Sequence, residues 1–206
     1  MKRLRLALVM ITAGLVLASQ AGAAFACVDC GPGRAMTAAH AVTAKYQSLS
    51  LAKKSGYSIL ADTAGITCIA EPQMSAMGAH DVAMGVHYVK GDLVKDPAID
   101  PIHPEALVYA PDRHGGLHLA ALEYVVIKAD WEAHNSPIAG APSWVKPAPP
   151  NLFGQEFNFT DAPNRYGLPP FYSLHAWVWK DNPAGTFAMW NPNVHCDETG
   201  VGVTPR

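Results

Sequence analysis

The sequence lacks a concentration of charge of either sign. Its 206 residues include 15 lysines and arginines and 17 aspartates and glutamates, which gives a formal net charge of −2 with neutral histidines. No basic stripe runs along the chain. Proteins that bind nucleic acid generally carry such a stripe to neutralise phosphates, so we expect no nucleic-acid partner.

Short catalytic motifs are missing as well. The chain contains no H-E-x-x-H pair, no P-loop, no dinucleotide-binding glycine fingerprint and no serine nucleophile elbow. These absences argue against the enzyme classes that a linear pattern identifies. Any ligand or metal site must therefore be assembled by the fold from residues that are far apart in the sequence.

Long apolar runs are confined to the N-terminus. Residues 6–18 form an apolar stretch behind a basic start, and residues 19–26 are mostly small. This pattern is typical of a secretory signal peptide, so we expect residues 1–26 to be a signal peptide and residues 27–206 a single globular domain, periplasmic or secreted. No later run reaches the roughly 20 apolar residues that cross a bilayer, so we expect no transmembrane segment in the mature chain.

Cysteine is scarce, with four residues in all. Export permits disulfides, and the economical pairing joins Cys68 to Cys196 and Cys27 to Cys30. The C-x-x-C spacing of Cys27 and Cys30 also suits a redox or metal motif, but a zinc ribbon would need a second such pair. Cleavage just before Cys27 would permit a lipid anchor there, which Phe25 disfavours.

The apolar pattern predicts one helix followed by several strands. Residues 35–55 have an apolar stripe at Val42, Tyr46 and Leu49, which indicates an amphipathic helix. The strands after it follow one another without the alternating helices of a parallel sheet. We therefore predict an α+β fold, in which the N-terminal amphipathic helix packs on a curved antiparallel sheet or partial β-barrel.

An aromatic-rich strand near the C-terminus contains a histidine. Side chains alternate along a strand, so His175, Trp177 and Trp179 are expected on one face. Leu174, Ala176 and Val178 occupy the other face, so both faces are apolar enough to be buried. An imidazole in this setting needs a carboxylate, a backbone group or a metal ion as its partner.

Two further strands each contain one unusual polar residue. Glu123 is the only polar member of the face formed by Leu117, Leu119, Ala121, Val125 and Ile127. Burying a carboxylate without compensation costs several kcal/mol, and the few arginines of the mature chain all lie in predicted turns or at the ends. His87 lies mid-strand beside Gly85, a residue that permits close approach of another backbone or of a ligand.

Two histidines and one carboxylate on separate strands form the ligand set of many zinc and non-haem iron sites. We therefore predict that His87, Glu123 and His175 bind a divalent transition metal, namely zinc, iron, manganese or copper. The alternative is a buried hydrogen-bonded network that only specifies the core. The two interpretations differ in whether the trio contacts an ion.

A small-molecule pocket is expected beside this trio. Its predicted lining consists of Tyr88, Gln155, Trp177, Trp179 and Trp190. Under the metal hypothesis the protein is an exported metal-binding protein with a small-molecule substrate and possible metalloenzyme activity. The alternative is a non-enzymatic periplasmic binding protein for a small apolar or aromatic ligand, in which the polar trio is structural.

Several segments resemble a group of uncharacterised small exported bacterial proteins. The shared segments are M-G-x-H-Y from Met84, P-E-x-L-x-Y from Pro104, and H-A-W-x-W followed by N-P-x-G-x-F from His175. The resemblance covers most of the mature chain. It implies a bacterial exported protein, and it implies no activity.

Overall fold

The computed structural model describes residues 31–71, 82–137, 140, 142 and 144–196. The predicted signal peptide, its cleavage site, and Cys27 and Cys30 lie outside this part of the chain.

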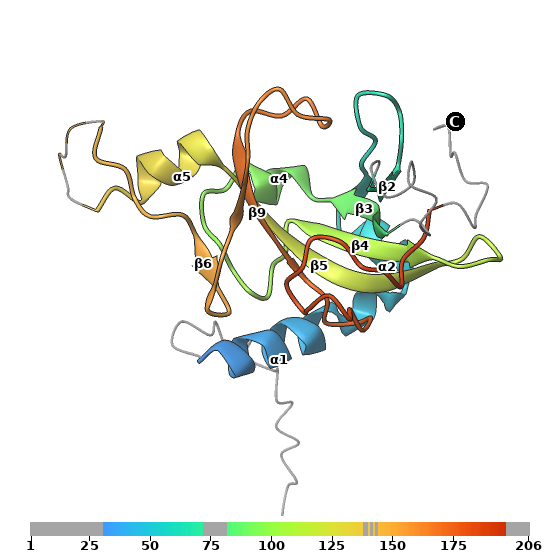
Figure 1. Ribbon diagram of the computed structural model, residues 1–206. Coiled ribbons are helices and arrows are strands. Elements are labelled where there is room, and N and C mark those ends of the chain that lie inside the picture. Colours follow the sequence, from blue (N-terminus) through green and yellow to red (C-terminus); the bar gives the residue numbers. More distant parts are fainter. Residues whose placement is uncertain (1–30, 72–81, 138–139, 141, 143, 197–206) are drawn as a thin grey trace, which may run out of the picture.

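The described residues form a mixed helix and antiparallel sheet structure, as the α+β prediction requires (Figure 1). Seven strands form one sheet in the order β1-β3-β4-β5-β9-β8, with β2 also paired to β3. This path has two open ends, so the sheet does not close into a barrel. Its strands are β1 (Ser58–Ile59), β2 (Cys68–Ala70), β3 (Ala83–Val89), β4 (Ala106–Pro111), β5 (Leu117–Ile127), β8 (Asn158–Thr160) and β9 (Phe171–Ala176).

The remaining elements are short. A two-stranded ribbon joins β6 (Asn151–Leu152) to β7 (Gln155–Glu156). The helices are α1 (Pro32–Thr43), a 3₁₀ turn η1 (Ala44–Gln47), α2 (Leu49–Lys54), α4 (Gly91–Val94) and α5 (Lys128–His134).

The predicted continuous helix 35–55 is divided at η1. Two members of the predicted stripe face the core, because Tyr46 is buried and Leu49 packs partly buried against the same cluster. Ala35, Ala39 and Thr43 are buried on α1, whereas Val42 is exposed. The buried residues of α1 recur every four positions, which is a helical spacing, but they are small residues and not the larger Val42. Small residues let the α1 backbone lie close to the strands, and Figure 1 shows α1 running beneath β5 and β9.

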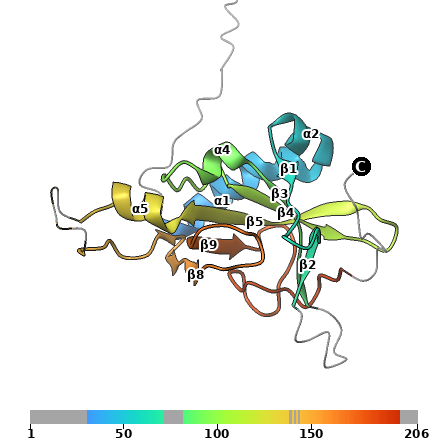
Figure 2. The same ribbon diagram turned by 90° about the horizontal axis from the view of Figure 1, so that it is seen from above.

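The main apolar core lies on the α1 face of the sheet. Ala35 and Ala39 of α1 and Ala52 of α2 belong to one buried cluster, which also contains Leu107, Tyr109, Leu122, Tyr124 and Leu174 of the three central strands. Alternate residues of the same strands point to the opposite face. Figure 2 shows the sheet from above, with α1 and α2 on one side of β5 and with β8 and β9 toward the other.

A bulge in β5 places Leu119 on the opposite face from the one that the sequence predicted. The register of β4 and β5 shifts between Val108 and Tyr109, so that Leu119 pairs with Tyr109 and joins the core cluster on the α1 face. Leu119 therefore does not share a face with Glu123, because the extra residue inverts the alternation on that side of the bulge. Ala121 and Val125 keep the predicted orientation.

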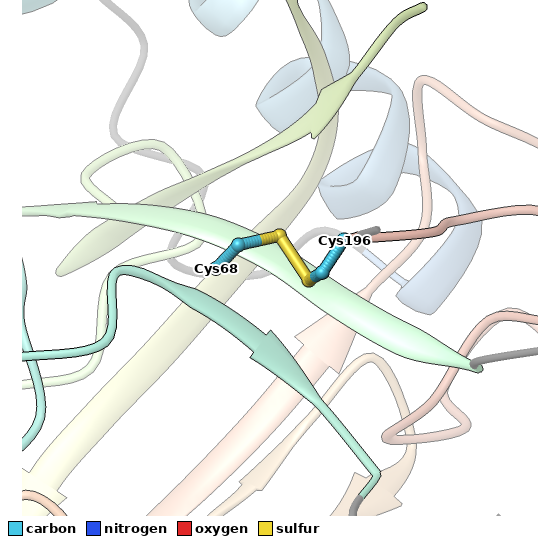
Figure 3. Close-up of a disulfide and its surroundings, with 2 residues drawn as sticks. All are labelled: Cys68 and Cys196. Atoms are coloured by element: carbon cyan, nitrogen blue, oxygen red, sulfur yellow. A yellow bond between two sulfur atoms is a disulfide. The ribbon is translucent and has the colours of Figure 1, made fainter. Parts of the chain in front are cut away.

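A disulfide joins Cys68 of β2 to Cys196, 128 residues later, with a Cα–Cα distance of 5.6 Å (Figure 3). This is the long-range pairing expected from the sequence. A bridge that closes so long a loop stabilises the fold by about 4–5 kcal/mol in the chain-entropy model.

Gly85 allows β3 to approach β4 closely. Its φ of +108° lies in the left-handed region, and a Cβ built there would lie 2.5 Å from the Tyr109 carbonyl oxygen. We expect Gly85→Ala to lower the free energy of unfolding by roughly 2–4 kcal/mol, because strain and overpacking add. Urea unfolding measures this change. Gly33→Ala, which meets no atom within 4 Å, is the control and should be neutral or slightly stabilising.

Candidate metal centre

The three predicted ligands lie on one face of the sheet, opposite the α1 core. His87 comes from β3, Glu123 from β5 and His175 from β9. Glu123 and His175 are directly paired across neighbouring strands. Cross-strand pairs bring side chains within about 5 Å at Cβ, so this pair is fixed by register alone.

His87 reaches the other two across the intervening strand β4. Val108 of β4 pairs with His87, and Ala106 pairs with Glu123. Ala106 is fully buried and has only a methyl side chain, so it leaves space above β4. The imidazole of His87 and the carboxylate of Glu123 meet in that space.

The ligand atoms of the three side chains form a compact group. His87 Nε2 lies 3.4 Å from His175 Nε2 and 3.4 Å from Glu123 Oε2, and His175 Nε2 lies 3.7 Å from Glu123 Oε1. One ligand atom of each residue lies within 4.8 Å of the others, so the group can hold a metal ion. The structure therefore brings together all three residues that the sequence singled out.

Burial determines the ionisation of this group. His87, Glu123 and His175 are 2 %, 9 % and 1 % exposed. Burial lowers the pKa of His87 to about 4, and the backbone of Gly85 only partly opposes this. Burial, aided by the charge of His87, lowers the pKa of His175 to about 3. Burial raises the pKa of Glu123 to about 8 despite a hydrogen bond from Ser173.

Packing orients the two imidazoles. The His175 ring stacks on Trp177 with centroids 6.3 Å apart, and the two imidazoles meet edge to face at 5.7 Å. Within the described chain, the Nδ1 atoms of His87 and His175 are buried without a hydrogen-bond partner. The contacts with neighbouring rings orient each imidazole so that its Nε2 atom faces the centre of the group.

The nearest arginine does not neutralise Glu123. Arg165 instead binds Asp62, with its Nε and Nη2 atoms 3.1 and 2.7 Å from Asp62 Oδ2. The expectation that Glu123 lacks an arginine partner thus holds for the described residues. Among the described residues, the basic side chains within 4 Å of its carboxylate are the two imidazoles.

Two cavities meet at the trio. The larger has a volume of about 590 Å³ and includes His87 and Glu123 in its wall. The smaller, of about 310 Å³, includes Glu123 and His175. Glu123, Tyr166 and Phe171 line both cavities, so small molecules can reach the trio from two sides.

The tryptophans predicted to wall the pocket lie in different places. Trp190 lines the smaller cavity, as expected. Trp177 is buried behind His175 and donates to the Ala188 carbonyl. Trp179 stacks on His40 of α1 and donates to Thr43, so it lies on the other side of the sheet. Because β9 ends at Ala176, the alternation that grouped these residues does not continue to Trp179.

Tyr88 and Gln155 are also displaced from the predicted pocket. Tyr88 follows His87 in β3, so its ring points to the α1 core, where it contacts Tyr109 edge to face. Gln155 is exposed on the β6–β7 ribbon. Neither residue lines either of the two cavities.

Sequence reasoning missed the loop that closes the site. Residues 161–170 place Tyr166 between the two cavities, and Asn164 holds this loop by accepting from the backbone amides of Tyr166 and Leu168. The Arg165–Asp62 pair anchors the loop to the body of the protein. The only signal in the sequence was its run of turn residues, which does not indicate what the loop covers.

A second buried carboxylate lies on the opposite face. Glu105 precedes β4, accepts from the Val125 amide, and is 2 % exposed. Burial raises its pKa to about 8. Its carboxylate accepts from a backbone amide and not from an imidazole, so it has the burial of Glu123 without the ligand set.

Comparison of the chain with protein-family models, curated protein sequences and solved structures finds no match. The argument for function therefore rests on the geometry and chemistry of the site.

The buried carboxylates predict a pH dependence for the metal-free protein. Above pH 6.5, folded Glu123 and Glu105 keep protons that the unfolded chain has already lost, so the folded state binds more protons. The free energy of unfolding should therefore fall between pH 6.5 and 8, although His87 and His175, which stay neutral in the fold, oppose part of the fall near pH 6.5. The two carboxyls each contribute a slope of about 1.4 kcal/mol per pH unit. Glu123→Gln should remove about half of that slope.

Urea unfolding in a chelator at four pH values in this range measures the slope. Glu156→Gln, at an exposed glutamate, is the control and should keep the full slope. An unchanged slope in Glu123→Gln would show that Glu123 is ionised in the folded protein.

Proposed function

We propose that this protein is an exported metal-binding protein that holds one divalent transition-metal ion on His87, Glu123 and His175. The site serves small-molecule chemistry, with substrate reaching the ion through the adjoining cavities. The described residues contain no helix long and apolar enough to cross a membrane. The Cys68–Cys196 disulfide is compatible with an oxidising, exported location.

The spacing of the ligand atoms is the observation that carries this proposal. Around a tetrahedral ion with ligands at about 2.1 Å, neighbouring ligand atoms lie roughly 3.4 Å apart. The two Nε2 atoms lie 3.4 Å apart, His87 Nε2 lies 3.4 Å from Glu123 Oε2, and His175 Nε2 lies 3.7 Å from Glu123 Oε1. Each imidazole thus faces a different oxygen of the carboxylate, which could bind an ion through one or both oxygens. Hydrogen bonds between nitrogen and oxygen normally measure about 2.7–3.2 Å, so a purely hydrogen-bonded trio would be tighter. The separations therefore fit ligands arranged around a common ion better than direct partners.

The ionisation state also suits a metal site. Metal ligands must be deprotonated, and both histidines are neutral at pH 7 without any further cost. Glu123 would lose its proton on metal binding and supply the one negative charge. Imidazole and carboxylate together favour zinc, iron, manganese or copper over calcium.

Three protein ligands leave room for water or substrate on the ion, which is the arrangement of catalytic sites. A bound ion there would polarise an oxygen of the substrate or activate a water molecule. The chain's own residues hold the ion, exclude bulk water and orient the substrate. The competing proposal, a ligand-binding protein with a structural trio, is favoured by the apolar walls of the larger cavity, and it predicts no bound metal.

Metal content tests the proposal. The purified tag-free protein, treated with a chelator and reloaded with zinc, should bind about one equivalent by elemental analysis. Zinc at a hundredfold excess over its Kd should raise the free energy of unfolding by about 2.7 kcal/mol. His87→Ala and Glu123→Gln should each abolish both effects, because each removes one of only three ligands.

The matched control is His118→Ala. His118 forms an exposed pair with Asp112, with 2.7 Å between Nε2 and Oδ2, and its loss should leave zinc binding unchanged. Circular dichroism verifies that each variant is folded. One equivalent of zinc retained in folded Glu123→Gln and in folded His87→Ala would refute the site.

A further inference from the structure

The larger cavity is strongly asymmetric in its chemistry. Its walls are mostly apolar and come mainly from β3, α4, β5, the 161–170 loop and the first residue of β9. They include Val89, Val94, Val125, Ile127, Leu168 and Phe171. Charged groups other than the trio enter the lining only at Lys95 and Asp130. Lys95 is exposed, so it marks the mouth of the cavity.

Apart from Lys95 and Asp130, the polar side chains in this lining are few; His87 and Glu123 are buried and Tyr166 is half-buried. They are the imidazole of His87, the carboxylate of Glu123 and the phenol of Tyr166. Among the described residues that line this cavity, Tyr166 carries the only hydroxyl. The phenol hydroxyl of Tyr166 can donate a hydrogen bond.

The smaller cavity differs in both size and lining. Thr160, Asn164, Arg165 and Ser173 contribute polar groups to its wall, beside the side chains of Met189 and Trp190. Its volume is about half that of the larger cavity. A molecule with an extended apolar part therefore fits the larger cavity better, on both size and chemistry.

From this asymmetry we infer the substrate class. We propose that the larger cavity binds an amphipathic small molecule, an acyl or aryl chain that carries one oxygen-donor head group. The chain lies along Val94, Val125 and Leu168. The head group meets the ion at His87 and Glu123, and Tyr166 donates a hydrogen bond to it. This inference rests on the metal site proposed above.

Chain-length dependence of hydroxamate binding tests the inference. Acetohydroxamic and octanohydroxamic acids carry the same metal-binding oxygens and differ only in their apolar chain. Each methylene removed from water should tighten binding about fourfold, so octanohydroxamate should bind the zinc-loaded protein at least a hundredfold more tightly than acetohydroxamate. Isothermal titration calorimetry measures both Kd values, after elemental analysis has established the zinc content.

Three variants locate the binding of the chain and of the head group without changing the proposed metal-binding residues. Val94→Glu puts a charge in the apolar wall and should remove most of the chain-length gain. Val42→Glu makes the same change at an exposed position of α1 and should keep the gain. Tyr166→Phe should weaken both hydroxamates by a similar factor of about 5–10, because it removes a donor to the head group.

The outcomes separate this inference from the metal proposal. One equivalent of zinc with equal affinity for the two hydroxamates would overturn the substrate class and leave the metal site intact. A chain-length gain that persists in Val94→Glu would place the chain elsewhere and overturn the inference. Absence of bound zinc would overturn the metal site. Equally tight binding of octanohydroxamate by the metal-free protein would support the ligand-binding alternative and overturn the inferred head-group contact.

Discussion

The burial of Glu123 is the constraint on which the rest of the site depends. A carboxylate inside a protein must be protonated, paired with a cation or bound to a metal ion. The arginine nearest the site is already paired with Asp62. The groups that face Glu123 are the Ser173 hydroxyl, which donates a hydrogen bond to it, and two imidazoles that burial keeps neutral. Protonating either imidazole would create a buried positive charge, which has a desolvation cost of its own. A divalent ion would satisfy the carboxylate and both imidazoles at once.

The sheet explains how such a group is held without a local motif. Each ligand comes from a different strand, and backbone pairing fixes the separation between strands. The opposite face of the same strands packs on α1 and α2, so the ligands stand on a sheet that is buried on both sides. The C-terminal segment adds the wall containing Met189 and Trp190. It is tied to the sheet by the bridge between Ala83 and Asn191 and by the nearby disulfide. Rigid elements of this kind can hold ligand atoms in place before an ion arrives.

The sequence predicted which three residues meet at the site better than it predicted the residues around them, for a physical reason. His87, Glu123 and His175 stood out because each is a polar residue in an apolar strand, and strand alternation is a strong local rule. The rule failed at Leu119, where a bulge adds one residue, and at Trp179, where the strand had already ended. Tyr166 was missed because its loop has no periodicity. The position of that loop depends on a contact between Arg165 and Asp62, over a hundred residues apart.

The apolar walls of the larger cavity also affect the electrostatics at the buried trio. Low polarity around an ion strengthens its electrostatic interaction with a bound oxygen, because no water competes for the charge. The same apolar walls would attract the hydrocarbon part of a molecule and leave its oxygen atoms to the inner end. A site on the exposed rim of the sheet would have neither property. The location of His87 and Glu123 in the wall of an apolar cavity, rather than the trio alone, is therefore what would connect the proposed metal site to the proposed class of substrate.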